Sequence, residues 1–488
     1  MSTEDVASAT SPPGESAGAD ESTRSVFDRR YRALSVGVIT TVSVVAFESL
    51  GVATVLPVVA RELGGLGSFG WGLSALMLAN IVGAVVAGRV ADRGGPWVPF
   101  AASIAVFVAG CLLAAASPSW LVFLAGRAVQ GFGVGGVMAI AFMSIGATYP
   151  DHLQPRMYAL LSSAWSIPAL AGPPIGGLVA ETAGWPWVFI IIVPIAVVAA
   201  LLATPAMRRL VESGAPSEAP RGWRNNVVLN SVLLTAGTAV LLLALEAVSA
   251  LVVVVGVVAG LLIAGVGLRH VTPPGTLVAR RGVAAGIVVR AGLCGAYFGT
   301  EAFLPLGMSE LRGVGTTLSG IGLAVGALTW VGGSFWQAKV DGGTTRDRSR
   351  ATALGSLVLA VGAVVVAVAI LVPAVPAVFA VVGWGIGGLG MGVAVNASTS
   401  ETMRLSPPES LGLTSSSLQL AQTLATALIA GLGGGLISLV TAGGGTVATA
   451  LLITFAVTVA IALGSVVVAG RFRAGSEEPA PASANAVA

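Results

Sequence analysis

The stretch ALSVGVITTVSVVAFESLGVATVLPVVA, residues 33–60, decides the fold class of this chain. It is long enough to cross a bilayer as a helix, because about 20 residues suffice. Glu48 is its only charged residue, and no other charge lies within 12 residues on either side. A carboxylate at that depth costs about 3 kcal/mol to insert, so by default it faces a wet cavity and has a function. The stretch therefore predicts a membrane-spanning helix that carries a functional acid.

The composition extends this prediction to the whole chain. Of the 488 residues, 55% are hydrophobic and only 10% are charged, whereas soluble domains have about a quarter of their residues charged. The net charge of +3 is not gathered into a basic patch with interleaved aromatics, so we expect no nucleic-acid partner. Cys111 and Cys294 lie in apolar segments and indicate neither a disulfide framework nor a metal site. The composition excludes a soluble protein.

Apolar runs of spanning length predict fourteen transmembrane helices. The predicted spans are 33–60, 70–91, 98–117, 119–148, 157–182, 185–205, 226–246, 250–268, 283–305, 316–338, 351–372, 374–400, 411–440 and 446–470. They divide the chain into a disordered tail (1–32), an N-terminal six-helix half (33–205), a linker with two inserted spans (206–282), a C-terminal six-helix half (283–470) and a second disordered tail (471–488).

The basic residues predict the orientation of these spans. An even number of spans puts both termini on one side, and 21 of the 25 basic residues then fall on that side. Lysine and arginine accumulate in cytoplasmic loops. We therefore expect a multi-pass protein of the plasma (cell inner) membrane with both termini in the cytoplasm.

An internal repeat relates the two halves. An offset of 257 residues places Gly126 and Arg127 on Gly383 and Trp384, and five further matched pairs follow. Glycine-rich helices can also match by chance. A real repeat implies two parallel six-span halves around a midplane site, which is a transporter architecture with alternating access.

Three motifs resemble those of the major facilitator superfamily. Gly88-Arg89-Val90-Ala91-Asp92-Arg93-Gly94-Gly95 resembles the family signature that follows the second span, although Pro96 and Trp97 stand where two basic residues are usual. The resemblance implies a gating latch made by Gly88, Asp92 and Arg93. An ordinary solvated loop pair is the alternative.

The other motifs narrow the resemblance. Gly126-Arg127-Ala128-Val129-Gln130-Gly131-Phe132-Gly133 resembles the fourth-span motif of proton-driven antiporters, with its buried arginine. Gly172-Pro173-Pro174-Ile175-Gly176-Gly177 resembles the fifth-span motif of exporters, in which Gly172, Pro173 and Gly176 would make a pliable gating helix; a plain kinked helix is the alternative. Together with Glu48 and Pro57 in the first span, they imply a fourteen-span drug:proton antiporter of the major facilitator fold.

The source of energy follows from which motifs the sequence contains. The sequence has no phosphate-binding G-x-x-x-x-G-K-[ST] loop and no credible catalytic triad, so we expect neither an enzyme nor a cofactor. We expect the proton gradient to be the driving force. We hypothesise that Glu48 carries the proton and that Arg127 tunes it, the alternative being a static ion pair. Glu301 is the second candidate, and a wet vestibule residue is the alternative for it.

The cargo is indicated only by residue type. Candidate cavity residues combine aromatic faces with amides, which suits loosely recognised amphipathic solutes; they are Phe47, Asn80, Gln130, Trp165, Phe298, Trp330, Asn396, Gln419 and Gln422. Aromatic residues in a span can equally face lipid or the core.

We therefore predict a proton-coupled exporter of lipophilic, amphipathic or cationic compounds. Its partners are small molecules, protons and membrane lipids, and we expect it to function as a monomer. A dedicated lipid or metabolite exporter, with lateral access at the inserted spans, is the alternative, followed by a non-transporting scaffold or receptor.

Overall fold

The computed structural model describes residues 25–149, 153, 157, 160–161, 163–212, 227–245, 250–341, 348–407 and 411–472. Of the tails predicted for residues 1–32 and 471–488, residues 25–32 and 471–472 lie within these ranges, where Val26, Tyr31 and Phe472 are buried, and the rest lies outside them. Within them, thirteen helices are long and apolar enough to cross a membrane. This confirms the prediction of an all-α polytopic membrane protein.

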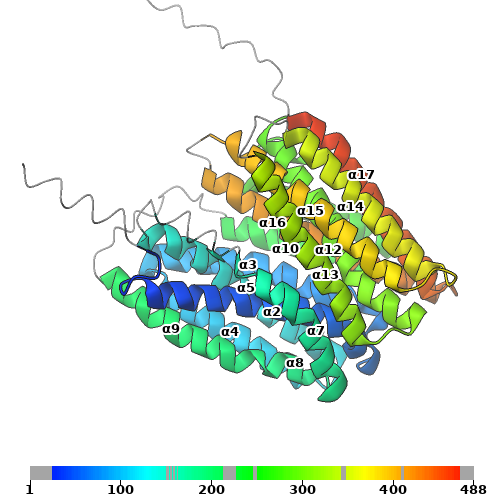
Figure 1. Ribbon diagram of the computed structural model, residues 1–488, viewed down its shortest axis with the longest axis horizontal. Coiled ribbons are helices and arrows are strands. Elements are labelled where there is room, and N and C mark those ends of the chain that lie inside the picture. The colour runs from blue at the N-terminus through cyan, green and yellow to red at the C-terminus, as the bar shows by residue number, and fades with distance from the viewer. Residues whose placement is uncertain are drawn as a thin grey trace, which may run out of the picture.

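The N-terminal half begins the bundle (Figure 1). Its helices are α2 (Arg32–Glu62), α3 (Trp71–Gly94), α4 (Trp97–Ala115), α5 (Trp120–Thr148), α7 (Ser166–Thr182), the short α8 (Pro186–Ile190) and α9 (Ile192–Glu212), with the 3-10 turn η1 (Leu66–Ser68) before α3. The fifth predicted span, 157–182, falls partly outside the described residues. The sixth is divided at Ile191, and α9 extends seven residues beyond the predicted end at 205.

The inserted pair of helices and the C-terminal half complete the helix bundle. Their helices are α10 (Val227–Leu245), α11 (Ala250–Val271), α12 (Val283–Arg312), α13 (Thr316–Asp341), α14 (Arg348–Leu371), α15 (Val378–Arg404), α16 (Leu411–Ala442) and α17 (Val447–Ala469). The predicted end of the ninth span at Pro305 is wrong, because α12 continues through this proline to Arg312. Membrane helices tolerate an internal proline where neighbouring helices enclose the freed backbone groups, and Pro305 is buried.

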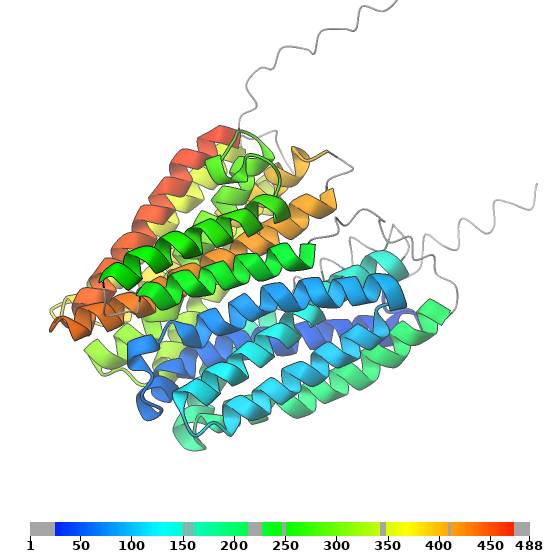
Figure 2. The same cartoon turned by 180° about the vertical axis from the view of Figure 1, so that it is seen from behind.

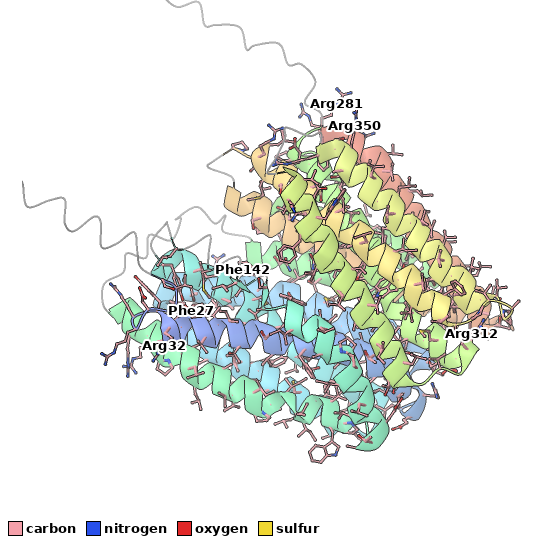
Figure 3. The ribbon with its side chains drawn as sticks, viewed as in Figure 1. Phe27, Arg32, Phe142, Arg281, Arg312 and Arg350 are labelled. Atoms are coloured by element: carbon pink, nitrogen blue, oxygen red, sulfur yellow. The ribbon has the colours of Figure 1, made fainter. Side chains whose placement is uncertain are left out.

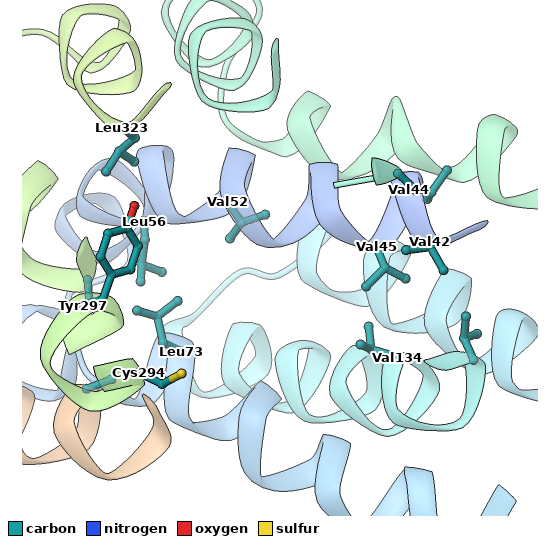
Figure 4. Packing of buried hydrophobic residues seen from close by; sticks show 14 of the residues in the cluster. Val42, Val44, Val45, Val52, Leu56, Leu73, Val134, Cys294, Tyr297 and Leu323 are labelled. Carbon is teal, nitrogen blue, oxygen red and sulfur yellow. The ribbon is translucent and has the colours of Figure 1, made fainter. Parts of the chain in front are cut away.

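The two halves diverge toward one end of the molecule (Figure 1). This is the end where α2 begins and α17 ends, and Arg32, Arg281 and Arg350 lie there (Figure 3); we call it the basic end. Arg312 lies at the opposite end, which we call the far end. The hydrophobic core is continuous across the halves, and Figure 4 shows Leu73 of α3 close to Tyr297 of α12.

Polar contacts join the halves at the far end. Arg61, in the last turn of α2, forms an ion pair of 2.8 Å with Glu310 of α12. Glu181, near the end of α7, accepts hydrogen bonds from the backbone N–H of Thr317 at 3.0 Å and from its hydroxyl at 2.6 Å. The far end is therefore closed by side chains of both halves in this conformation.

The inserted helix α10 lies along the seam between α3 and α16, with α11 outside it (Figure 2). Its Leu242 packs with Leu78 of α3 and Ala427 of α16. Leu234, two turns nearer the basic end, belongs to a second apolar cluster that again takes one residue from each of these helices. The pair covers this seam, so it does not open a lateral path there in this conformation.

The sequence repeat is also a repeat of helix packing. A Cβ atom added to Gly131 of α5 would lie 2.0 Å from the carbonyl oxygen of Leu76 in α3. The matched Gly388 of α15 stands in the same relation to α13, where the carbonyl oxygen of Gly326 would be 2.1 Å away. Only glycine allows such close approach of two helix backbones.

A second pair of matched glycines contacts the third helix of each half. Gly133 lies against the backbone of Phe107 in α4, and Gly390 lies against the backbone of Leu359 in α14, with added Cβ atoms 2.5 Å from the nearest backbone nitrogen in both cases. The fourth helix of each half thus packs between the second and third through the same glycine positions, which chance similarity does not explain.

We expect Gly388→Val to lower the melting temperature of the detergent-solubilised protein, because overpacking costs about 1–3 kcal/mol. Gly332→Val is the matched control on a neighbouring span, since nothing lies within 4 Å of a Cβ atom there. Thermal unfolding followed by tryptophan fluorescence measures both. Equal melting temperatures for the two variants would refute the role of this contact.

Candidate functional site

Glu48 and Arg127 form a buried ion pair between α2 and α5. Their side chains are each 1% exposed, and Arg127 Nη1 donates to Glu48 Oε1. The guanidinium also donates through Nε to the carbonyl oxygen of Gly72, at 3.0 Å. The structure thus brings the two candidate residues into direct contact, as both the proton-carrier hypothesis and the static ion-pair alternative require. Their roles stay a prediction.

Gln130 completes this polar network. It stands three residues after Arg127, so the helical period puts both on one face of α5. Its Oε1 accepts from Arg127 Nη1 at 3.0 Å, while its Nε2 donates to Cys111 Sγ at 3.1 Å and, more weakly, to Glu48 Oε1 at 3.4 Å. Gln130 is therefore a member of the ionic network.

One oxygen of the network remains available. Glu48 Oε2 is buried and has no hydrogen-bond partner among the described residues. A buried charge is stable only when it is paired, and the single arginine satisfies that need through Oε1. Oε2 is thus an acceptor at which a proton could be taken up when water reaches the site.

Glu301 lies apart from this network, in the C-terminal half. It is 7% exposed and stands one helical turn after Tyr297 on α12, so the two side chains share a face. Tyr297 stacks on Trp384 at a centroid distance of 4.4 Å and meets Trp330 edge-on at 5.0 Å. Phe298 approaches Trp330 at 5.9 Å. The second candidate acid therefore adjoins a cluster of four aromatic rings.

Trp384 occupies in α15 the repeat position that Arg127 occupies in α5. It is fully buried, and its Nε1 has no hydrogen-bond partner among the described residues. The N-terminal half thus carries an ionic network where the C-terminal half carries aromatic rings. Sequence reasoning missed Tyr297 and Trp384 as site residues, although the alignment of Trp384 with Arg127 was a signal for the second.

The fifth-span motif lies where α7 meets both α2 and α13. An added Cβ atom on Gly176 would lie 3.0 Å from the backbone of Gly51 in α2. Gly320 of α13 packs against the carbonyl oxygen of Pro173, 2.4 Å from its added Cβ. Gly172 faces Phe47, with 3.6 Å between its added Cβ and the ring. Close packing of this motif against a partner helix is observed, and its gating role stays a prediction.

The signature after the second span is helical and not a loop. α3 continues to Gly94, and the turn is made by Gly95, whose φ of 81° favours glycine. Gly88 lies inside the helix with nothing within 4 Å of its Cβ position. The side chains of Asp92 and Arg93 lie outside the described residues, so the latch stays a prediction.

The remaining cavity candidates stand on separate helices. Asn80, Asn396 and Gln422 are half-buried on α3, α15 and α16, whereas Gln419 is exposed and Trp165 is 36% exposed. Nothing in the described structure brings these five together into one site. Among the described residues, no group of three His, Cys, Asp or Glu side chains could hold a metal ion.

The fold and the buried charges define a class of membrane transporter, and comparison with known proteins identifies it. Residues 37–430 match the family model of the Major Facilitator Superfamily. The chain belongs to this superfamily. Its members are secondary transporters and not enzymes.

Curated relatives share part of the chain. A probable multidrug-efflux transporter of Mycobacterium tuberculosis is 28% identical over 210 residues, which are 43% of this chain and 44% of that protein. A multidrug transporter protein of Bacillus subtilis is 24% identical over 181 residues, 37% of this chain and 34% of its own length. The matches thus span less than half of these relatives.

Solved structures agree on the fold over nearly the whole chain. A D-xylose–proton symporter superposes with a TM-score of 0.63 at 14% identity, covering 90% of this chain and 97% of that one. A POT family transporter superposes with a TM-score of 0.65 at 12% identity, covering 90% and 98%. At these identities the likeness concerns the fold alone.

A double-mutant cycle tests how the ion pair holds the fold. We expect Arg127→Met alone to lower stability strongly, because removing one partner of a buried pair costs about 3–5 kcal/mol. Adding Glu48→Gln should restore much of the loss, since no buried charge then remains unpaired. Melting temperatures of the wild type, both single variants and the double variant give the coupling. Additive losses would mean that the two side chains do not interact.

Proposed function

We propose that this chain is a proton-coupled exporter of lipophilic, amphipathic or cationic compounds, of the fourteen-span drug:proton antiporter type. The observation that carries the proposal is the buried Glu48–Arg127–Gln130 network, placed between helices of a major facilitator bundle. Buried ionisable groups in a membrane span mark ion pathways by default. Relatives named as multidrug-efflux transporters support the choice of cargo class.

The orientation is proposed from the charge distribution. If the basic end faces the cytoplasm, as the positive-inside rule favours, the far end is the outer side. The outer side is then the closed one, held by Arg61–Glu310 and by Glu181 with Thr317. Export requires these contacts to break while the halves approach each other at the basic end.

Proton coupling is proposed to operate at Glu48. Water that reaches Oε2 in one access state can protonate the carboxylate, and protonation removes the attraction to Arg127. The guanidinium is then free to shift toward Gln130 and the carbonyl oxygen of Gly72, to which it already donates. Deprotonation in the other access state restores the ion pair, so each cycle moves one proton inward.

The cargo is proposed to bind beside Glu301. Aromatic faces attract cations, most strongly where water is excluded, and Tyr297, Phe298 and Trp330 stand next to this acid. An amphipathic cation would place its charge near the carboxylate and its apolar part on the rings. A neutral lipid or metabolite would gain no charge attraction from Glu301, which separates the two candidate cargo classes.

Transport by proteoliposomes tests the proposal. We expect several chemically unrelated lipophilic cations to dissipate an imposed pH gradient in the presence of the wild-type protein, and Glu48→Gln to abolish this. Glu62→Gln is the matched control, because its amide oxygen can still accept the 2.7 Å hydrogen bond from Trp185 Nε1. A pH-sensitive dye inside the vesicles measures the gradient.

Two outcomes would redirect the proposal. A flat trace for the whole panel would favour a dedicated lipid or metabolite carrier. Full coupling in Glu48→Gln would leave Glu48 as a structural residue, and the same assay on Glu301→Gln would then show whether the second acid carries the proton.

Crosslinking across the far end tests alternating access. In a cysteine-free background, Cys side chains at positions 181 and 317 should be bridged by a short bifunctional thiol reagent, because Glu181 and Thr317 are in direct contact. Bridging is expected to stop transport, and cleavage of a disulfide-containing bridge should restore it. Unchanged transport by the bridged protein would mean that the far end need not open.

A further inference from the structure

Arg290 of α12 is a charge inside a membrane span that the proposed proton coupling does not use. It stands about two turns after Val283, the first residue of the helix. It is half-buried, and its Nε is fully buried with no hydrogen-bond partner among the described residues. It also forms no ion pair with any described acid. A charge in a membrane span is costly without a partner and marks a functional site by default.

The side chain of Arg290 is directed into the span and not out of it. An arginine near a helix end can extend its side chain to the headgroups, which removes the cost of burial. The guanidinium of Arg290 instead interacts with the thiol of Cys294, one helical turn further from the basic end. A thiol is only a weak acceptor and does not balance a charge. The positive charge is therefore held inside the span without a described anion to offset it.

The opposite side of α12 is packed against other helices of the C-terminal half. A Cβ atom added to Gly292 would lie 2.2 Å from Ser465 Oγ in α17, and one added to Gly295 would lie 3.5 Å from the Cβ atom of Ala425 in α16. Residues two and five positions along a helix point to roughly the opposite side. Gly292 and Gly295 therefore point away from Arg290, so the arginine does not face α16 or α17.

The side of α12 that carries Arg290 faces the N-terminal half. Cys294 and Tyr297 follow Arg290 at four and seven positions, so the helical period puts all three on one face. Figure 4 shows Cys294 and Tyr297 beside Leu73 of α3, in a core that both halves share. Arg290 lies on the same face but nearer the basic end, where the halves diverge (Figure 1). It therefore stands between the halves, on the side from which cargo would enter.

Glu301 continues this face toward the far end. It lies eleven residues after Arg290, and three helical turns take about 10.8 residues, so both point the same way. Glu301 likewise forms no ion pair with a described residue. Because the guanidinium lies beside Cys294, the two charges are about 10 Å apart along the helix, at about 1.5 Å per residue. The aromatic ring of Tyr297 comes between them.

We propose that the cargo site takes a zwitterionic amphiphile. Its carboxylate, sulfonate or phosphate lies at Arg290, its cationic group lies at Glu301, and its apolar body lies on the rings of Tyr297 and Phe298. The planar guanidinium suits such oxyanions because it can donate two parallel hydrogen bonds. A purely cationic cargo would leave Arg290 unpaired, whereas a zwitterion offsets both charges. The inference rests on the proposed function for Glu301 as the cation site and narrows the cargo class.

Two matched compounds test the proposal. Carboxyheptyl triphenylphosphonium is a zwitterion whose chain length is chosen to match the spacing of the two charges, and its methyl ester is a cation of similar size. Quenching of tryptophan fluorescence in the purified protein measures both affinities. We expect the ratio of the zwitterion affinity to the ester affinity to fall about tenfold in Arg290→Gln, because a hydrogen bond between charged groups is lost. The affinity for the ester should not change.

Two variants serve as controls. Arg290→Lys keeps the charge and should retain most of the ratio. Arg281→Gln removes an exposed arginine at the same end of the molecule (Figure 3) and should leave the ratio unchanged. An unchanged ratio in Arg290→Gln, or an equal fall in Arg281→Gln, would overturn the anion site. Binding of the ester would then still support the proposed function.

A shorter pair of compounds tests the spacing without any variant. The chain of carboxypropyl triphenylphosphonium is too short to span both charges, so in the wild type its affinity ratio to its own methyl ester should be lower than that of the heptyl pair. Equal ratios for the two chain lengths would contradict the two-charge site. Failure of the wild type to bind any of the four compounds would overturn the proposed cargo class, and this inference with it.

Discussion

The ion pair between Glu48 and Arg127 is the constraint on which the N-terminal half depends. Two buried charges are tolerated only when they are opposite and paired, and removing one leaves the desolvation cost of the other uncompensated. The pair therefore fixes α2 against α5 and forces Gln130, Cys111 and the carbonyl oxygen of Gly72 into supporting positions. The ion pair is neutral as a whole while Glu48 is ionised, and protonation of Glu48 would leave Arg127 as an unpaired buried charge. A coupled transporter needs a contact whose stability depends on protonation in this way.

The repeat shows that the same helix packing holds different buried side chains in the two halves. Matched glycines seat α5 and α15 between their neighbours in the same way. On that common scaffold, the N-terminal half places Arg127 where the C-terminal half places Trp384, stacked on Tyr297. At this matched position the N-terminal half thus has a charged side chain and the C-terminal half an aromatic one. This asymmetry favours a division between proton handling and cargo binding that two equivalent halves would not provide.

Sequence alone predicted the spans well because hydropathy and length constrain membrane helices strongly. It failed at Pro305, since a proline ends a helix in water but not among packed helices. Glu48 was identified from its cost in a membrane and Arg127 from the fourth-span motif, and an interaction between them was hypothesised. The geometry of their contact depends on how α2 meets α5. The far-end pair of Arg61 and Glu310 was missed, because two charges at helix ends look like solvated residues until tertiary structure joins them.

The central claim is that cargo binding and the protonation of Glu48 are linked. Proton release on cargo binding tests it most directly, with purified protein in weakly buffered detergent solution and a pH indicator. Addition of tetraphenylphosphonium should release protons from the wild type, and Glu48→Gln should bind the same cation without releasing them. Equal release by the wild type and the variant would contradict the account.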